Sequence, residues 1–290
     1  MFGQTLISGL AVGSIYSLVA FGFCITFTCN RTLNFGQGQF VMLGAMLAYT
    51  FTVGLNTPFI FGLIFVTLIV ALVGILLERI AVYPFLRFAT AMGWVLSTLA
   101  ASIVIENIAL FLWGKQPLQV ASVLGSKAIR FWGIGIFPQE LLILLAATII
   151  VAGTELFYKK TAFGRALRAT AENEEAAKIM GVNTRLTVSF SYALSSAIAG
   201  AAGFLLAPLT SASPDMGGEL GLKAFGVAII GGLVDFKGVI LSGLILGVFE
   251  NLVAVYISSS QRNILGFSLV IALLLIRPLG ILIKTHGQKV

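Results

Sequence analysis

The sequence predicts an all-α membrane protein, a polytopic bundle of transmembrane helices. Apolar residues occupy 58% of the 290 positions and charged residues only 10%, whereas a soluble domain has roughly 45–50% apolar and about 25% charged residues. Mean hydropathy is +1.03. Residues 1–30 and 32–77 contain no charged side chain, and a helix needs about 20 apolar residues to cross a bilayer. The bilayer is therefore the expected solvent.

Nine apolar segments account for the predicted bundle, and the pattern also allows eight or ten crossings. The seventh segment is short for a full span, so we expect it to be tilted or re-entrant. No linker divides the chain, and residues 1–290 should form a single membrane domain. The segments are residues 6–28, 35–53, 59–77, 91–113, 141–158, 187–208, 222–234, 239–257 and 264–283.

Glycines lie inside these apolar runs. In a membrane helix, small residues let two backbones approach closely. The pairs Gly9/Gly13 and Gly243/Gly247 have GxxxG spacing, which predicts close helix packing at both places.

The distribution of basic residues predicts the orientation. Cytoplasmic loops carry an excess of Lys and Arg. Of the 18 basic residues, 13 fall in one set of loops and five in the opposite set, namely Lys115, Lys127, Arg130, Lys223 and Arg262. The first set should be cytoplasmic, which places the N-terminus outside and the C-terminus inside a bacterial inner membrane.

The cytoplasmic loop at about 159–186 mixes apolar and charged residues. Asn173 is a predicted N-cap and Gly181 a predicted terminator of a short helix over residues 174–180. A solvated connector is one interpretation of this loop. The apolar residues Phe163, Ile179 and Met180, which a solvated connector does not need, favour the other, a docking surface for a cytosolic partner.

Four segments, in chain order, resemble permeases of the branched-chain amino acid family of ABC importers. They are LNFGQGQF at 33–40 followed by MLGA at 42–45, GRALRATAENEEAAKIMGVN at 164–183, GGL at 231–233 with the glycines up to Glu250, and RPLG at 277–280. The resemblance covers nearly the whole chain.

The resemblance implies partners as well as a fold. Such a permease pairs with a homologous second permease, two cytoplasmic ATP-binding subunits and an extracytoplasmic solute-binding protein, within the lipid bilayer and without nucleic acid. The loop would couple the ATPase subunits to the membrane path, with Ala177 facing the partner. The implied coupling residues are Phe163, Gly164, Arg165, Arg168, Glu174, Glu175, Ala177 and Gly181.

Catalytic and cofactor motifs are not found in the sequence. Gly114-Lys115 is followed by Gln116, which does not match the GxxxxGK[ST] phosphate loop. ATP and Mg²⁺ are therefore expected on the partner ATPase subunits, and no cofactor on this chain. No HExxH or Ser/His/Asp arrangement is apparent, so we expect neither an enzyme nor a metal site.

Polar residues within the apolar segments are candidates for the translocation path: Asn34, Gln37, Glu106 and Asn107. A carboxylate at membrane depth costs about 2.5–3.5 kcal/mol on insertion scales, so it should face the bundle or an aqueous path. Asn34 and Gln37 either line the path or cap a helix. For Glu250, helix packing is the favoured interpretation.

The expected solute is a branched-chain or related small amino acid. The same machinery carrying urea or a short amide is one alternative. An ion-coupled secondary transporter is another, although that class usually shows internal repeats and mid-membrane ionisable residues, for which only Glu106 and Glu250 qualify.

The basic asymmetry makes a testable prediction of topology. Cysteines introduced near Lys160 and near Lys289 should be shielded from a membrane-impermeant thiol reagent in intact cells, while one near Asp215 should react. Labelling near Lys160 but not near Asp215 would reverse the orientation.

Overall fold

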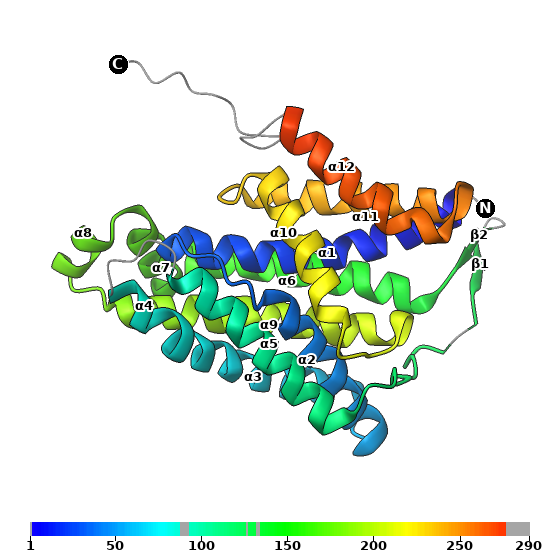
Figure 1. Cartoon of the computed structure of the whole chain (residues 1–290), viewed down its shortest axis with the longest axis horizontal. Helices are drawn as coiled ribbons and strands as arrows, with labels where there is room; N and C mark the ends of the chain where they lie inside the picture. The colour runs from blue at the N-terminus through cyan, green and yellow to red at the C-terminus, as the bar shows by residue number, and fades with distance from the viewer. Residues whose placement is uncertain (1, 88–92, 126, 132–133, 277–290) are drawn as a thin grey trace.

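A computed structural model describes residues 2–87, 93–125, 127–131 and 134–276. Most of its helices run along one direction, with the N-terminus at one end of the bundle and α8 at the other (Figure 1). The RPLG segment at 277–280 and Lys289 lie outside the described residues.

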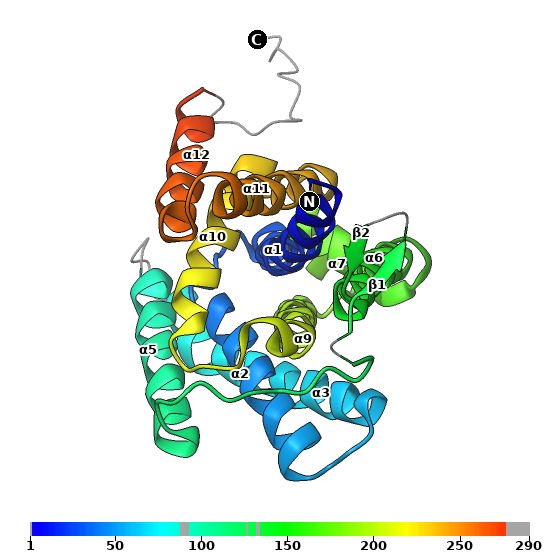
Figure 2. The same ribbon diagram turned by 90° about the vertical axis from the view of Figure 1, so that its right-hand side faces the viewer.

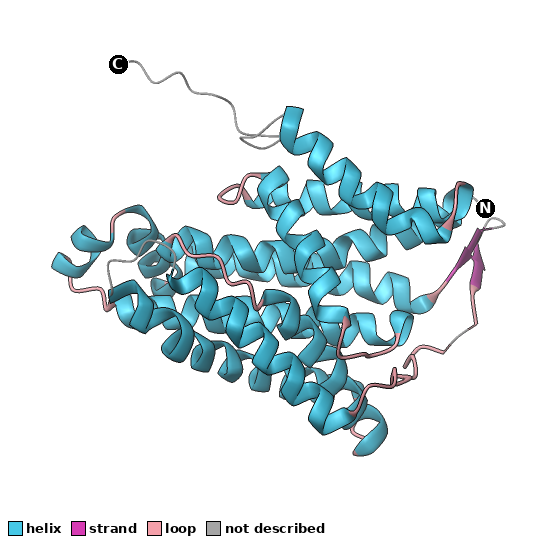
Figure 3. Cartoon of the chain, viewed as in Figure 1, coloured by secondary structure: helices cyan, strands magenta, loops and turns pink. Residues whose placement is uncertain are grey.

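Helices make up almost all of the described chain (Figure 3). The one hairpin among the described residues pairs Ile129 with Ile136 in antiparallel register. The elements are α1 (Phe2–Asn30), α2 (Gln37–Tyr49), α3 (Phe59–Leu77), α4 (Tyr83–Arg87), α5 (Gly93–Trp113), β1 (Ile129–Phe131), β2 (Ile134–Ile136), α6 (Pro138–Lys160), α7 (Ala162–Glu172), α8 (Glu174–Ile179), α9 (Thr184–Thr210), α10 (Met216–Gly231), α11 (Phe236–Tyr256) and α12 (Arg262–Ile276), with short π or 3-10 turns at Thr50–Gly54, Glu78–Val82 and Ser259–Gln261.

Seven helices in the described part of the chain are long and apolar enough to cross a membrane. They contain α1, α3, α5, α6, α9, α11 and α12. The remaining two predicted segments correspond to α2 and α10, which have 13 and 16 residues and are not among these seven. The all-α membrane class is confirmed. The count of nine crossings and the orientation of the termini stay predictions.

Helices α1 and α9 form the centre of the bundle. Both lie inside a ring formed by α2, α3, α6, α10 and α11 (Figure 2). Most of their residues are buried, whereas α3, α5, α6 and α12 expose large apolar side chains. That pattern suits helices whose outer faces meet lipid or another membrane protein.

Glycines determine how closely α1 and α11 approach. A Cβ added to Gly13 would lie 2.8 Å from the carbonyl oxygen of Gly243, and one added to Gly247 would overlap the backbone of Gly13. Gly9 meets the Cα of Val248 in the same way. The close packing predicted for both GxxxG pairs is confirmed, and the structure shows that the two pairs pack against each other.

A second glycine contact seats the start of α2 on α10. A Cβ on Gly38 would overlap the carbonyl of Gly217 and lie 2.8 Å from the Cα of Gly221. The short helix α10 is thereby held against the interior, and its last turn ends at Gly232 in the left-handed conformation, with φ of 84°. Glycine adopts this conformation without a Cβ clash.

Adding a single methyl group tests the α1–α11 contact. Gly247→Ala should destabilise the permease by about 1–3 kcal/mol, because the new Cβ forces the two helices apart. The measurement is thermal unfolding of the detergent-solubilised protein.

The matched control is Gly153→Ala in α6, where the new Cβ would meet nothing within 4 Å. It should leave the melting temperature unchanged or slightly raised, since Ala is the better helix former. Equal stability of the two variants would contradict the proposed packing role.

Candidate functional site

The chain leaves α1 and enters α2 through a polar turn. The Asn34 side chain is buried, and its Oδ1 accepts a hydrogen bond from the backbone N–H of Gly36 at 3.0 Å. Its amide nitrogen is buried without a hydrogen-bond partner in the described structure. Helix α2 begins directly afterwards, at Gln37. The predicted apolar segment 35–53 thus begins as a turn and becomes helical at Gln37.

Gln37 ties three helices together. Its Nε2 donates to the carbonyl oxygen of Ser195 in α9 at 3.3 Å. The Ser195 hydroxyl lies 3.1 Å from the Gln37 side-chain oxygen and 2.8 Å from the carbonyl oxygen of Gly22 in α1. Gln37 is fully buried in this contact, so its place is in the packing of α1, α2 and α9.

Glu106 and Asn107 lie on two different sides of α5. The Nε2 atom of Gln39 donates to Glu106 Oε2 at 3.1 Å, which joins α5 to α2. Asn107 is exposed, and its Nδ2 donates to the backbone of its own helix, at Ile103. The four candidate path residues thus do not form one cluster: Glu106 contacts Gln39, while Asn34 and Gln37 bond elsewhere.

The loop at about 159–186 folds into α7 and α8 with well-formed caps. Thr161 Oγ1 accepts from the N–H of Gly164, and Asn173 Oδ1 accepts from the N–H of Ala176 at 3.0 Å. Gly181 follows with φ of 84°. The predicted N-cap and terminator are confirmed, and the helix spans Glu174–Ile179, within one residue of the predicted range.

The prediction that Ala177 faces a partner is wrong. Ala177 is only 3% exposed, whereas Ile179 and Met180 are 86% and 83% exposed. Its side of α8 packs toward the start of α9, where the Thr184 hydroxyl lies 3.3 Å from Glu174 Oε1. The spacing of residues cannot say which face of a six-residue helix meets its neighbour.

The other coupling candidates divide into packed and exposed residues. Gly164 lies against the backbone of Phe157 and Tyr158 in α6, and the Phe163 ring packs on Phe190 with centroids 4.6 Å apart. Phe163 is still 38% exposed, and the other exposed candidates are Arg165, Arg168, Glu174, Glu175 and Gly181.

A buried ion network went unrecognised in the sequence. Lys223, which we assigned to an outward-facing loop, lies inside the bundle on α10, so that assignment is wrong. Its Nζ is 3.0 Å from Glu250 Oε1 and 2.9 Å from Glu219 Oε1. The Glu219–Lys223 spacing of i,i+4 was the available signal, because such residues are neighbours on a helix.

Glu250 is the centre of this network. Arg262 Nε lies 3.2 Å from Glu250 Oε2, and the Tyr16 hydroxyl donates to the same oxygen at 2.8 Å. The carboxylate is thus paired with two cations, as burial of a charge in a membrane protein requires.

Comparison with known proteins identifies the family. A family model described as the permease component of branched-chain amino acid transport systems matches residues 5–277. The high-affinity branched-chain amino acid transport system permease protein LivH of Salmonella typhimurium is 28% identical over 302 residues, covering 100% of this chain and 98% of LivH. BraD of Pseudomonas aeruginosa, with the same description, is 28% identical over 300 residues, covering 99% and 97%.

A solved structure supports the fold alone. A chain of PsaBC from Streptococcus pneumoniae in complex with Fab superposes with a TM-score of 0.51 at 14% identity, covering 96% of this chain and 92% of that one. Together with the apolar helices, the match over residues 5–277 confirms the resemblance seen in the motifs. The chain belongs to the family of branched-chain amino acid transport system permease components, and it is a multi-pass protein of the bacterial inner membrane.

Proposed function

We propose that this permease imports branched-chain amino acids, forming half of a translocation path together with a homologous second permease. Two ATP-binding subunits would drive it from the cytoplasm, and an extracytoplasmic binding protein would deliver the solute. The full-length similarity to LivH and BraD supports this solute class. The xylose permease protein XylH of Escherichia coli is 30% identical over only 138 residues, or 47% of this chain, which gives a sugar less support.

The observation that most strongly supports this proposal is the exposure of helix α8. It lies at the end of the bundle opposite the N-terminus (Figure 1) and exposes Ile179 and Met180 almost completely. Exposed apolar residues beside charged ones are typical of an interaction site. Because α8 packs on α9 and α7 packs on α6, a protein bound to α8 is mechanically connected to the membrane helices. An ATP-binding subunit fits this position.

The exposed face of α5 supports the proposal of a second permease. Its outer face exposes Phe111 and Ile108 together with Asn107. A polar side chain on a face that meets hydrocarbon is costly, and polar side chains in membrane helices often bond across a helix–helix contact, so contact with another protein suits this face better than lipid. Glu106 lies next to it and bonds to Gln39, which would place its carboxylate at the border between the two permeases.

Reconstitution distinguishes this importer from an ion-coupled transporter. The permeases, ATPase subunits and binding protein should together take up tritiated L-leucine in proteoliposomes only when ATP is supplied to the ATPase side. Collapsing the ion gradients should leave the uptake unchanged. Uptake driven by a gradient in the absence of ATP would refute the proposal.

A substitution at Glu106 tests whether this residue belongs to the translocation path. Glu106→Gln keeps an oxygen that can accept from Gln39 but removes the charge, so assembly with the ATPase subunits should persist while leucine uptake falls at least several-fold. Co-purification of the subunits and initial uptake rates are the two measurements. Unchanged uptake would assign Glu106 to packing.

Two substitutions on α8 separate coupling from folding. Ile179→Glu places a charge on the exposed face and should abolish leucine uptake and the stimulation of ATP hydrolysis together, with normal thermal stability. Ala177→Arg inserts a long side chain at a buried position and should instead lower the melting temperature, since overpacking typically costs about 1–3 kcal/mol. Wild-type uptake by Ile179→Glu would reduce α8 to a connector.

A further inference from the structure

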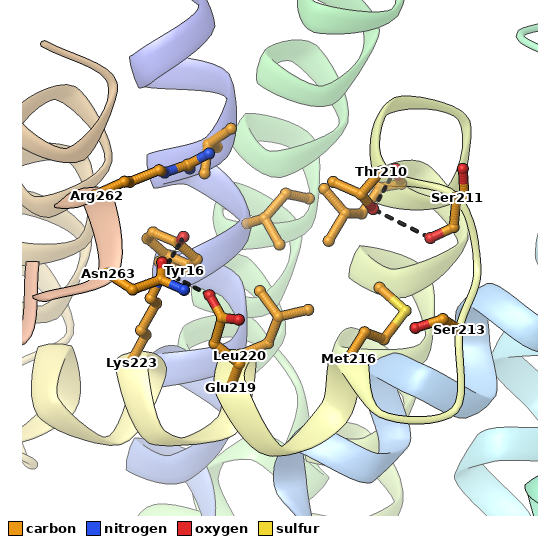
Figure 4. A pocket seen from close by; sticks show the side chains of 13 residues that line it. Tyr16, Thr210, Ser211, Ser213, Met216, Glu219, Leu220, Lys223, Arg262 and Asn263 are labelled. Atoms are coloured by element: carbon orange, nitrogen blue, oxygen red, sulfur yellow. Dashed lines mark hydrogen bonds and ion pairs between the residues drawn. The ribbon is translucent and has the colours of Figure 1, made fainter. Parts of the chain in front are cut away.

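We propose that the cavity beside Glu219 and Arg262 binds the imported solute as a zwitterion with an apolar side chain. The cavity has a volume of about 200 Å³. It lies between α1, the connection from α9 to α10, α10 itself and the start of α12 (Figure 4). This inference rests on the proposed function and assigns its substrate a place in the chain.

The cavity belongs to the end of the bundle where the solute is expected to enter. The N-terminus and the start of α12 lie at the same end, opposite α8 (Figure 1). If α8 meets the ATPase subunits, this end faces the binding protein. The residues from Thr210 to Ser213, in the connection between α9 and α10, form the opposite wall of the cavity from Lys223 and Asn263 (Figure 4).

Lys223 is too fully occupied to serve as the ligand-binding cation. It is 2% exposed and lies within 3.0 Å of Glu219, Glu250 and the Oδ1 atom of Asn263. Its role is to hold those three groups in place. Glu250 is likewise buried between Lys223 and Arg262.

Arg262 and Glu219 carry the charges that remain accessible at the cavity. Their side chains are 31% and 49% exposed, and both line its wall. The contact with Glu250 uses the Nε of Arg262, and a guanidinium has five N–H donors in a fork that matches a carboxylate. The Glu219 carboxylate is acceptor-only and suits an ammonium group.

The remaining wall fits an apolar side chain. Leu220 and Met216 extend from α10 between the charged side and the Thr210–Ser213 side (Figure 4), and Leu206 and Ile15 complete the lining. A volume of about 200 Å³ lies below the roughly 300–1,000 Å³ of pockets for drug-sized ligands, which limits the occupant to a small solute.

The balance of charges around the cavity favours a zwitterionic solute. The two cations, Lys223 and Arg262, offset the two carboxylates, Glu219 and Glu250, so the formal charges of the network sum to zero and give no net attraction to an anion or a cation. A solute that lacks one of its two charged groups would lose either the contact with the N–H groups of Arg262 that Glu250 does not use or the contact with the exposed Glu219 carboxylate. Sites of this kind reject analogues that lack a required polar group.

Equilibrium binding to the assembled importer, without its binding protein, tests the site. Tritiated L-leucine should bind the wild-type complex. Two competitors that keep the side chain but lack one charge, 3-methylbutylamine and 4-methylpentanoate, should each compete at least tenfold more weakly than unlabelled leucine.

Glu219→Gln should weaken leucine binding at least tenfold and leave the affinity for 4-methylpentanoate unchanged or higher, because that compound has no ammonium group and the variant network carries one more positive than negative charge. Lys223 retains its contacts with Glu250 and Asn263 in this variant, so the fold should persist. Glu155→Gln is the matched control: Glu155 is also an exposed carboxylate paired with a lysine at i,i+4, Lys159, but lies on α6. It should bind leucine as the wild type does.

Leu220→Ala should change the ligand preference of the site, which a loss of folding would not do. Enlarging the apolar part of the cavity should raise the affinity for L-phenylalanine relative to L-leucine at least threefold. An unchanged ratio would contradict the assignment of Leu220 to the side-chain end.

The site and the proposed function can fail separately. Absence of leucine binding in the wild-type complex, or equal affinity in Glu219→Gln and Glu155→Gln, overturns the site while ATP-driven leucine uptake by the complete importer still stands. ATP-driven uptake of urea with no uptake of any amino acid overturns both.

Discussion

The rest of the structure depends on the close contact of α1 with α11. Lipid tails are as apolar as the side chains that face them, so membrane helices associate through close packing and hydrogen bonds rather than through the exclusion of water. Gly13 and Gly247 supply the close packing. One turn further along each helix, Tyr16 and Glu250 supply the hydrogen bond, at 2.8 Å. A wider separation of the two helices would break that bond and leave the buried carboxylate with one partner fewer.

The ion network explains how a short helix can lie within the bundle. Helix α10 has only 16 residues, and polar contacts hold it in the bundle in addition to apolar ones. Its Lys223 joins the helix to α11 through Glu250 and to α12 through Asn263, while Gly217 and Gly221 let α2 lie directly on its backbone. In this network the buried Lys223 and Glu250 each have an opposite charge beside them, which offsets part of the cost of burial.

Features decided by neighbouring residues could be predicted from the sequence. The membrane class follows from composition, the cap at Asn173 and the terminator at Gly181 from the local pattern, and the GxxxG contacts from spacing. Lys223 could not be placed, because its partner Glu250 is 27 residues away and a hydropathy pattern does not record partners. The orientation of Ala177 depends on where α9 lies, and the extent of α2 and α10 depends on their backbone contacts with each other.

The distance along the chain between α1 and its main partner constrains biosynthesis. Tyr16 and Glu250 are separated by 234 positions, so α1 enters the membrane long before α11 has been translated. Until then its glycine-lined face, with Ser14 and Ser17, has no final partner. A nascent chain interrupted before α11 therefore keeps an incompletely packed helix in the bilayer. Membrane proteases and insertion chaperones can use the unpaired packing surface of this helix to distinguish unfinished copies from finished ones.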